Sequence, residues 1–540
     1  MKQYTSDVVI IGGGITGIVA ALELLSAGRK VLLLDRDVEV NFGGLAKESF
    51  GGVFVVDSVE QRRAGCRDSP ELAYRDLVTF GELDRPDPDL EWPKKWARAY
   101  VDHCNPDVYE WLKERGASFV PLPHWIERGQ FTPGNSLPRF HIVWGAGYGL
   151  INHLLMALER HPQRRNLTIQ FDHRVDELLI SNGRVIGCRG LITVRENQSP
   201  FDFEATGGAV IVAAGGINGD MDRVRANWHL DWGQPPEVIL NGSHKFADGR
   251  LHDAVVASGG KLTHMDRMWN YAAGVHHWNP RKPNHGLSLV PPRSALWLNW
   301  QGKRIGPQPL VTGFDTRDLV TQVCRQERQY SWQLLNMRIA AKELAVSGAE
   351  FNVSIREKRK FSFIRELLFG NMKLVNELLS NCEDFVVGHS LAELVEKMNA
   401  LNGDDAVDLN AVTDVVARYD EQIDRGPRFH NDEQLRRIAY VRKWRGDRLR
   451  TCKFQKILDD KALPLIAIRE FIVSRKSLGG IQTNLDGQVL DLCGKPIPGL
   501  FAAGEATGFG GGGMNGLRAL EGTFLGGCIF SGRRAGLAAR

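Results

Sequence analysis

Closely spaced cysteines are absent from this chain. Its eight cysteines are scattered singly, and no CxxC pair occurs. Zinc sites, dithiol redox centres and covalent haem attachment all depend on cysteines at short spacing, so none of these is expected and no metal site is predicted. Unpaired thiols are typical of proteins in a reducing compartment, and we therefore expect a cytoplasmic protein.

Long hydrophobic runs and long runs of one charge are also missing. The apolar stretch up to Leu25 is broken by Gly12, Gly13, Gly14 and Gly17, which fits neither a secretory signal nor a membrane span. The 68 basic and 64 acidic side chains almost balance, to a net charge of +4. We therefore expect no nucleic-acid partner and no integral membrane segment.

The most basic local stretch is REKRKFSFIRE at residues 356–366, where aromatic side chains are interleaved with cations. A solvated helix face explains this pattern better than an anionic partner. No internal repeat or low-complexity tract occurs. At 540 residues the chain exceeds one ordinary core, which predicts two packed domains.

A nucleotide-binding turn is predicted near the start of the chain. Residues 8–11 form a branched apolar run, as expected for a buried parallel strand, and Gly12, Gly14 and Gly17 follow in GxGxxG spacing. The first glycine permits the tight turn, the second admits a pyrophosphate and the third lets helix and strand pack closely. Ile15 and Thr16 would open the helix whose N-terminus holds the phosphates.

An acidic residue follows at the expected distance. A second buried strand, at 30–34, ends in Asp35, where a carboxylate can accept hydrogen bonds from ribose hydroxyls, and Arg36 comes next. Strand, glycines, helix, strand and acid in this order predict dinucleotide binding. No second GxGxxG with a following acid occurs, so a separate NAD(P)H domain is not expected.

Further segments favour FAD over a nicotinamide. Gly43 and Gly44 supply small residues near a pyrophosphate, and a predicted hairpin at 173–190 places Val175 where flavoproteins contact adenine. A buried strand at 209–214 ends in Ala214 and Gly215. Near the C-terminus, PIPGLFAAGEATG contributes Gly504, with Glu505 as acceptor for the ribitol hydroxyls. Because both ends of the chain supply parts of one site, an insertion must lie between them.

These motifs resemble the FAD-dependent fumarate reductase, succinate dehydrogenase and 3-ketosteroid Δ1-dehydrogenase flavoproteins. The match is most specific in GFGGGGMNGLRALEGTFLGGCIFSGRRAG at 508–536, which is similar to the bacterial FAD-binding dehydrogenases described as ketosteroid-dehydrogenase-like and adds Gly522 and Thr523 to the FAD contacts. The resemblance implies an α/β Rossmann-like FAD-binding domain formed by 1–271 and 446–540, with an α+β substrate cap inserted at 272–445. FAD is expected to be non-covalent, because Asn41 and Phe42 precede the Gly-Gly pair where covalently flavinylated relatives have a histidine.

The resemblance also implies catalytic residues. Tyr271 stands where the soluble fumarate reductases have a substrate-binding histidine, which favours a carbonyl substrate because a phenol donates a hydrogen bond but carries no positive charge. Arg317 matches their proton-donating arginine, and Arg518 is placed to contact substrate or flavin. Ile466 replaces the ketone-polarising tyrosine of the steroid enzymes, and Arg475 with Lys476 replaces a histidine pair of the reductases.

The catalytic base is not identified by these patterns. Tyr148 and Tyr330 are candidates, and Arg139 and His141 are candidates to line the cavity. Two amphipathic helices split at Asn105 and Pro106 are expected over 91–115, and further helices around 318–348 and 389–425.

The predicted function is FAD-dependent dehydrogenation of a CH–CH bond next to the carbonyl of a steroid-like or cyclic ketone. Two alternatives stay open: reduction of an activated alkene, as in fumarate reductases, and a non-catalytic FAD-binding redox sensor or assembly partner. The expected partners are a small ketone or enone and a separate electron acceptor or donor, because no CxxCH or iron–sulfur spacing occurs.

Overall fold

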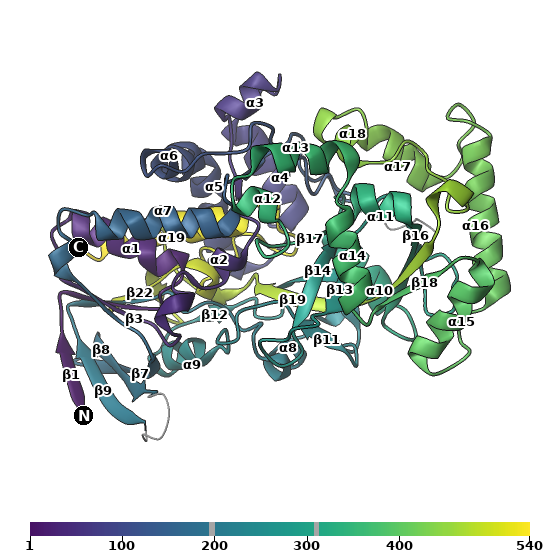
Figure 1. The fold of residues 1–540 in the computed structure, drawn as a ribbon. Coiled ribbons are helices and arrows are strands. Elements are labelled where there is room, and N and C mark those ends of the chain that lie inside the picture. Colours follow the sequence, from purple (N-terminus) through teal and green to yellow (C-terminus); the bar gives the residue numbers. More distant parts are fainter. Residues whose placement is uncertain (194–199, 307–312) are drawn as a thin grey trace.

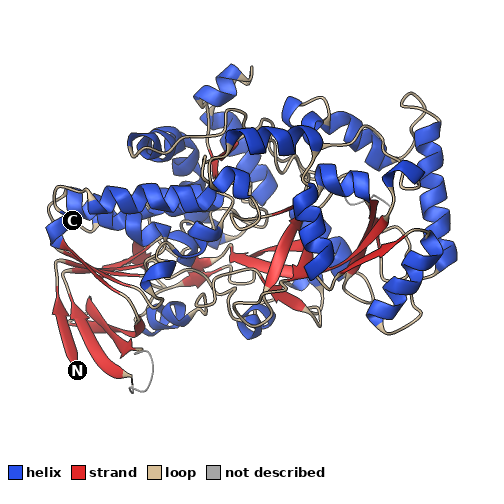
Figure 2. Cartoon of the chain, viewed as in Figure 1, coloured by secondary structure: helices blue, strands red, loops and turns tan. Residues whose placement is uncertain are grey.

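The computed structural model describes residues 1–193, 200–306 and 313–540. A body of sheet and helices that carries both termini lies beside a second body formed by the middle of the chain (Figure 1). Strands run through both bodies and helices cover them (Figure 2). The prediction of a mixed α/β fold is confirmed.

The centre of the first body is a six-stranded sheet with the order β21-β22-β10-β2-β3-β6. Its strands are β2 (Val8–Ile11), β3 (Val31–Leu34), β6 (Leu167–Gln170), β10 (Ala209–Val212), β21 (Gln488–Leu490) and β22 (Pro496–Ala502). All residues of β2 and β3 are buried, as a parallel strand covered on both faces requires. Since β22 pairs in parallel with β10, the C-terminal part of the chain completes a sheet that the N-terminal part begins.

Helices from opposite ends of the chain lie together on one face of this sheet (Figure 1). They are α1 (Ile15–Ser26), α2 (Gly44–Glu48), α7 (Ala146–Glu159) and α19 (Thr523–Ala538). Glycines let α1 and α19 approach closely: a Cβ on Gly532 would lie 2.8 Å from the carbonyl oxygen of Thr16, and one on Gly536 would lie 2.8 Å from that of Ala20. This contact fixes the helix that follows the glycine turn.

A four-stranded sheet, also part of the first body, packs against the other face of the six-stranded sheet. Its order is β1 (Lys2–Thr5), β9 (Phe201–Thr206), β8 (Arg184–Ile192) and β7 (His173–Ser181). The turn between β7 and β8 has positive φ at both Asn182 and Gly183, which suits a tight hairpin. The hairpin expected over 173–190 is therefore present.

The second body is built on an eight-stranded sheet. Its strands are β11 (Ile239–Asn241), β13 (Met268–His276), β14 (Gly286–Val290), β15 (Leu296–Leu298), β16 (Ser331–Asn336), β17 (Ala345–Val346), β18 (Phe385–Gly388) and β19 (Leu465–Ser477). The predicted limit at residue 271 falls inside β13, and β19 joins this sheet from beyond residue 445. The exact domain limits stay a prediction, with β13 and β19 leading from one body into the other.

Helices surround this second sheet. They are α8 (Met221–Ala226), α10 (Thr316–Cys324), α11 (Met337–Glu343), α12 (Val353–Arg356), α13 (Lys360–Phe369), α14 (Met372–Asn381), α15 (Leu391–Asn402), α16 (Leu409–Asp424), α17 (Glu433–Val441) and α18 (Arg445–Arg450). Helices α15 and α16 agree with the expectation for 389–425. The expectation for 318–348 missed β16, whose six residues are all buried beside β19, so pairing within the sheet decides their conformation.

The remaining α-helices and β-strands of the described residues complete the fold. They are β4 (Gly52–Phe54), α3 (Val59–Arg63), α4 (Pro70–Gly81), α5 (Glu91–Cys104), α6 (Trp111–Glu114), β5 (Phe140–Ile142), α9 (Arg250–Ala257), β12 (Leu262–Thr263) and β20 (Gly480–Ile481). Instead of splitting at Asn105 and Pro106, the chain continues from α5 to α6 through a π-helical turn. Among the described residues, no helix combines the length and apolarity needed to cross a bilayer.

Candidate active site

A cavity of about 710 Å³ lies between the glycine turn and the second sheet. Polar groups and aliphatic side chains from both bodies line it. Most residues predicted to bind FAD are among them: Gly12, Gly14, Ile15, Thr16, Asp35, Arg36, Gly43, Gly44, Val175, Ala214, Gly215, Glu505 and Gly522.

The glycines after β2 divide into two kinds. Gly12 has φ +112°, and a Cβ there would lie 2.3 Å from the carbonyl oxygen of Ala213; a Cβ on Gly17 would lie 2.0 Å from that of Gly12. Neither position can carry a side chain. Around Gly14, by contrast, a Cβ would meet no atom within 4 Å, and Gly14 caps α1 without a side-chain hydrogen bond. The N-terminus of α1 thus faces open space, as a bound pyrophosphate requires.

The end of β3 holds an acidic side chain at the cavity edge. Asp35 accepts hydrogen bonds from the backbone N–H groups of Gly13 at 2.6 Å and Asp37 at 2.7 Å. Burial raises the pKa of Asp35, and the two N–H groups oppose that shift. Arg36 forms an ion pair with Asp248 at 2.5 Å. Asp35 is thereby fixed where ribose hydroxyls can donate to it.

Three predicted FAD residues shape the cavity without lining it. Gly17 packs on the turn as described. A Cβ on Gly504 would lie 2.3 Å from the Thr16 hydroxyl oxygen, and the buried Thr523 hydroxyl donates to the carbonyl oxygen of Leu520 at 2.7 Å. Their roles as direct contacts stay predictions; in this structure they allow β22 and α19 to approach α1.

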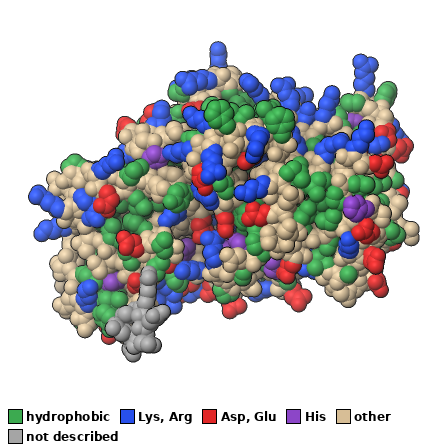
Figure 3. All heavy atoms as spheres, in the orientation of Figure 1, with side chains coloured by type: hydrophobic (Ala, Val, Ile, Leu, Met, Phe, Trp, Pro, Cys, Tyr) green, Lys and Arg blue, Asp and Glu red, His purple; other side chains and the backbone are tan. Residues whose placement is uncertain are grey.

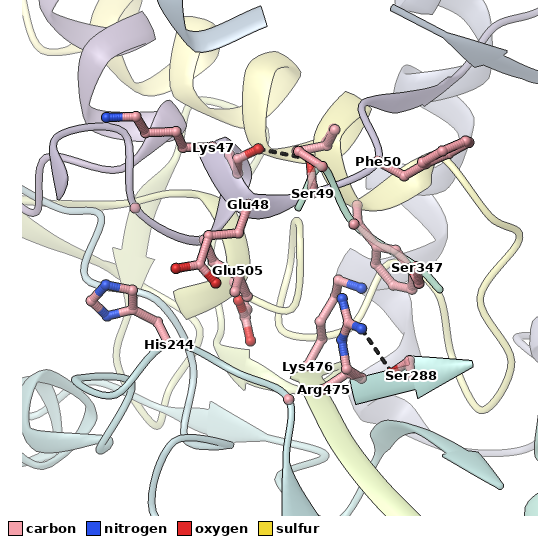
Figure 4. A pocket seen from close by; sticks show the side chains of 18 of the residues that line it. Lys47, Glu48, Ser49, Phe50, His244, Ser288, Ser347, Arg475, Lys476 and Glu505 are labelled. Atoms are coloured by element: carbon pink, nitrogen blue, oxygen red, sulfur yellow. Dashed lines mark hydrogen bonds between the residues drawn. The ribbon is translucent and has the colours of Figure 1, made fainter. Parts of the chain in front are cut away.

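A pair of cations projects from β19 into the cavity. Arg475 and Lys476 lie side by side, with the guanidinium of Arg475 donating to the Ser288 hydroxyl at 2.8 Å (Figure 4). The Lys476 ammonium lies 4.1 Å from the centroid of the Phe524 ring and makes no hydrogen bond with any described residue. Burial, and then the charge of Arg475, lowers the pKa of Lys476 to about 8. The Lys476 ammonium is therefore free to bind a ligand oxygen.

The opposite charge comes from Glu505, the residue expected to accept ribitol hydroxyls. Its carboxylate accepts a hydrogen bond from the backbone N–H of Ser477 at 3.1 Å. Burial raises the pKa of Glu505 to about 6. Figure 4 shows Glu505 in the pocket between Glu48 and the two cations.

Tyr271 reaches the cavity from β13 and is held by a carboxylate that the sequence prediction missed. Its phenol donates a short hydrogen bond to Oε1 of Glu521, and the Arg475 guanidinium lies 5.7 Å from the centre of its ring. Burial and the charge of Glu521 raise the pKa of Tyr271 well above its ordinary value. Glu521 also lines the cavity. A signal was present, because Glu521 is the one acidic residue in the glycine-rich segment 508–536.

A second carboxylate missed from the sequence is Glu127. It accepts a hydrogen bond from the Thr316 hydroxyl at 2.7 Å, and both residues line the cavity. Burial raises the pKa of Glu127 to about 8. The cavity therefore contains a carboxyl group that holds a proton near neutral pH.

The two predicted catalytic arginines lie near this wall but do not line the cavity. Arg317, on α10, donates to Asp231 at 2.9 Å and lies 3.3 Å from Nδ1 of His229. Arg518 donates to Asp315 at 3.1 Å and forms a second, shorter ion pair with Glu82. The structure thus brings both arginines next to Thr316, with carboxylate partners of their own. Their catalytic roles stay predictions, and residues 307–312 of the motif before Arg317 lie outside the described residues.

Other candidates have structural positions. His141 is buried between the Ser58 hydroxyl at 2.7 Å and the Arg139 carbonyl oxygen at 2.8 Å, away from the cavity lining. Tyr148 lines the cavity, whereas Tyr330 accepts a hydrogen bond from Asn402 at 2.8 Å elsewhere in the second body. Ile466 is fully buried in β19 and paired with β16 and β18. Ile466 is not among the residues that line the cavity.

The model of the family named FAD binding domain matches residues 7–525. The chain belongs to this family. It is also 41% identical, over 99% of its length and 96% of the relative, to a KsdD-like steroid dehydrogenase of Mycobacterium tuberculosis strain H37Rv. That relative places it in the family of the KsdD-like proteins. FAD as cofactor and an enzyme acting on CH–CH groups are thereby confirmed, which favours the enzyme over the non-catalytic alternative.

Solved structures share the fold. The 3-ketosteroid Δ1-dehydrogenase from Sterolibacterium denitrificans, in complex with 1,4-androstadiene-3,17-dione, has a TM-score of 0.68 at 16% identity and matches 98% of both chains. The open conformation of a flavocytochrome c3 fumarate reductase has a TM-score of 0.67 at 20% identity, over 99% of this chain and 78% of that one. The open space over Gly14 and the fixed Asp35 fit the pyrophosphate and ribose of FAD. Non-covalent attachment stays a prediction.

Proposed function

We propose that this enzyme removes hydrogen from the α and β carbons of an apolar, steroid-like ketone. The observation that carries the proposal is the Tyr271 phenol, held by Glu521 in the cavity wall beside two cations. The names of the 41% identical relative and of the steroid-binding structural neighbour support the same substrate class.

Glu521 is the proposed proton acceptor. One oxygen of its carboxylate accepts the Tyr271 hydrogen bond, and the other can take the α-proton of a ketone, which carbonyl polarisation acidifies. The raised pKa of Tyr271 keeps its phenol protonated, so it serves as a hydrogen-bond donor that positions Glu521 or the substrate carbonyl.

The cations of β19 stabilise the negative charge that develops. Lys476 has no hydrogen-bond partner among the described residues, and Arg475 uses one nitrogen for Ser288, so both can face an enolate oxygen. When bound, FAD supplies the two-electron acceptor for the hydride that leaves the β-carbon. Glu521 keeps the proton, and a carbon–carbon double bond remains in the product. We also propose that a separate electron acceptor then takes up the two electrons.

A second candidate, reduction of an activated alkene, is favoured by one observation. Arg475 and Lys476 form a cation pair that a substrate carboxylate would match. In that direction the protonated Glu127 or the Arg317 cluster would supply the proton.

The test is turnover of the purified FAD-loaded protein with 3-ketosteroids and an artificial electron acceptor, followed by mass spectrometry. The proposal expects a product two hydrogens lighter than the ketone, with an enone absorption band. Turnover that appears only with a reduced electron donor and an enone substrate would favour the second candidate instead.

A further inference from the structure

Helix α13 exposes an apolar face instead of burying it. The side chain of Phe361 is 91% exposed and that of Phe369 is 79% exposed, and Ile364 and Leu368 are about half exposed. Positions 361, 364 and 368 fall on one side of a helix. No residue of α13 is buried. Interpreting residues 356–366 as a solvated helix face explains the cations, but it does not explain why these apolar side chains are exposed.

Cations surround this face. Lys358, Lys360, Arg365 and Lys373 are exposed, and the last three make no ion pair with a described residue. The nearby Glu357 is already paired with Arg356 and Arg359, so the local excess of charge is positive. Figure 3 shows hydrophobic side chains next to Lys and Arg side chains on the upper surface, at the place of α13 in Figure 1.

The inner side of α13 anchors it near the cavity. Phe363 packs edge-to-face on Trp144, with ring centroids 5.6 Å apart. Arg356, in the helix just before, lines the active-site cavity. The exposed face therefore lies close to the rim of the cavity and is fixed to the body of the protein.

We propose that α13 docks on an anionic lipid bilayer, with Phe361 and Phe369 inserted at the interface and the surrounding cations against the headgroups. An amphipathic helix with bulky apolar residues on one side and flanking lysines and arginines has the chemistry for this surface. A second copy of the chain fits less well, since a symmetric contact would set these cations against the same cations.

This docking needs no substrate and goes beyond the proposed function. One consequence rests on that function: a bilayer against α13 would bring the cavity rim close to the phase in which an apolar ketone dissolves.

The experiment is co-sedimentation of the FAD-loaded protein with vesicles of phosphatidylcholine alone or mixed with phosphatidylglycerol. We expect about tenfold more bound protein with the anionic vesicles and a loss of that excess at high salt. The variant Phe361→Ser/Phe369→Ser should fall to the level seen with neutral vesicles. Lys360→Glu/Arg365→Glu should lose the anionic preference.

The matched control is Phe429→Ser/Leu492→Ser, which changes two side chains that are 70% and 78% exposed elsewhere. It should bind like the wild type. Retained flavin absorbance and an unchanged thermal midpoint show that each variant is folded. Equal binding to both vesicle types, or binding unaffected by Phe361→Ser/Phe369→Ser, would overturn the proposal. So would a fall in native mass in that variant, because α13 would then be covered by a second copy.

Discussion

The two halves of the cavity are built differently. The half around Gly12, Gly14 and Gly17 depends on the backbone within a few residues of one strand: at Gly12 and Gly17 the neighbouring backbone lies too close for a side chain, and at Gly14 it leaves open space. The other half gathers Tyr271, Glu521, Lys476 and their neighbours from segments far apart in the chain. The first half binds FAD through local backbone geometry. The second half determines the chemistry through charges that meet only in the folded protein.

Glu521→Gln should disturb the catalytic half of the cavity most, while the glycine-rich half stays intact. A glutamine can still accept the Tyr271 hydrogen bond but cannot take a proton from carbon, so we expect kcat to fall by about 100-fold to 1,000-fold. The flavin content, read from the ratio of visible to ultraviolet absorbance, should not change. A kcat within threefold of the wild type would remove Glu521 from proton transfer.

Tyr271→Phe should have the next largest effect. It removes the phenol whose single O–H positions Glu521 or the substrate carbonyl, so kcat should fall by roughly tenfold to 100-fold. Steady-state kinetics with the same ketone measure it, and FAD affinity by fluorescence serves as the control. If FAD affinity falls as much as turnover, Tyr271 acts on the cofactor half instead.

Gly14→Ala tests the first half alone. Its Cβ would enter open space, so the apoprotein should keep its thermal midpoint while the Kd for FAD rises by about tenfold. The matched variant Gly12→Ala meets a carbonyl oxygen at 2.3 Å and should lower the thermal midpoint of the apoprotein itself. Calorimetry of both apoproteins, with FAD titration, separates these outcomes; equal loss of stability in both would contradict the division.

The pH profile should show the smallest effect. Because the pKa of Lys476 is about 8, its positive charge is present below that pH and is lost above it. We therefore expect kcat/KM to fall a few-fold as pH rises through about 8. Lys476→Arg keeps the charge and should move the decline to higher pH. A wild-type decline that the substitution does not move would assign it to another group, such as Glu127.

Local geometry explains why part of the molecule could be predicted. The GxGxxG turn, the acid at Asp35 and the hairpin at Asn182 and Gly183 each depend on residues close in sequence. The partners of Tyr271 could not be found this way, because Glu521 lies 250 residues away. Likewise, β16 forms because β19 pairs with it, and burial beside that strand overrides its local pattern.

The exposure of α13 shows the same limit. Its sequence revealed cations and aromatics at helical spacing, but the pattern alone does not tell which side is covered. Trp144, more than 200 residues earlier in the chain, packs against Phe363, whereas Phe361 is exposed to solvent. The sequence therefore predicts the family and the cofactor more reliably than it predicts the contacts of the catalytic residues.

An anaerobic titration of the yellow protein with steroid and simple cyclic ketones tests the central claim most directly. The visible flavin band is followed as each ketone is added. The band should bleach with a steroid-like ketone while an enone appears. No bleaching by any ketone, with chemically reduced flavin reoxidised by fumarate or an enone, would contradict it and establish a reductase.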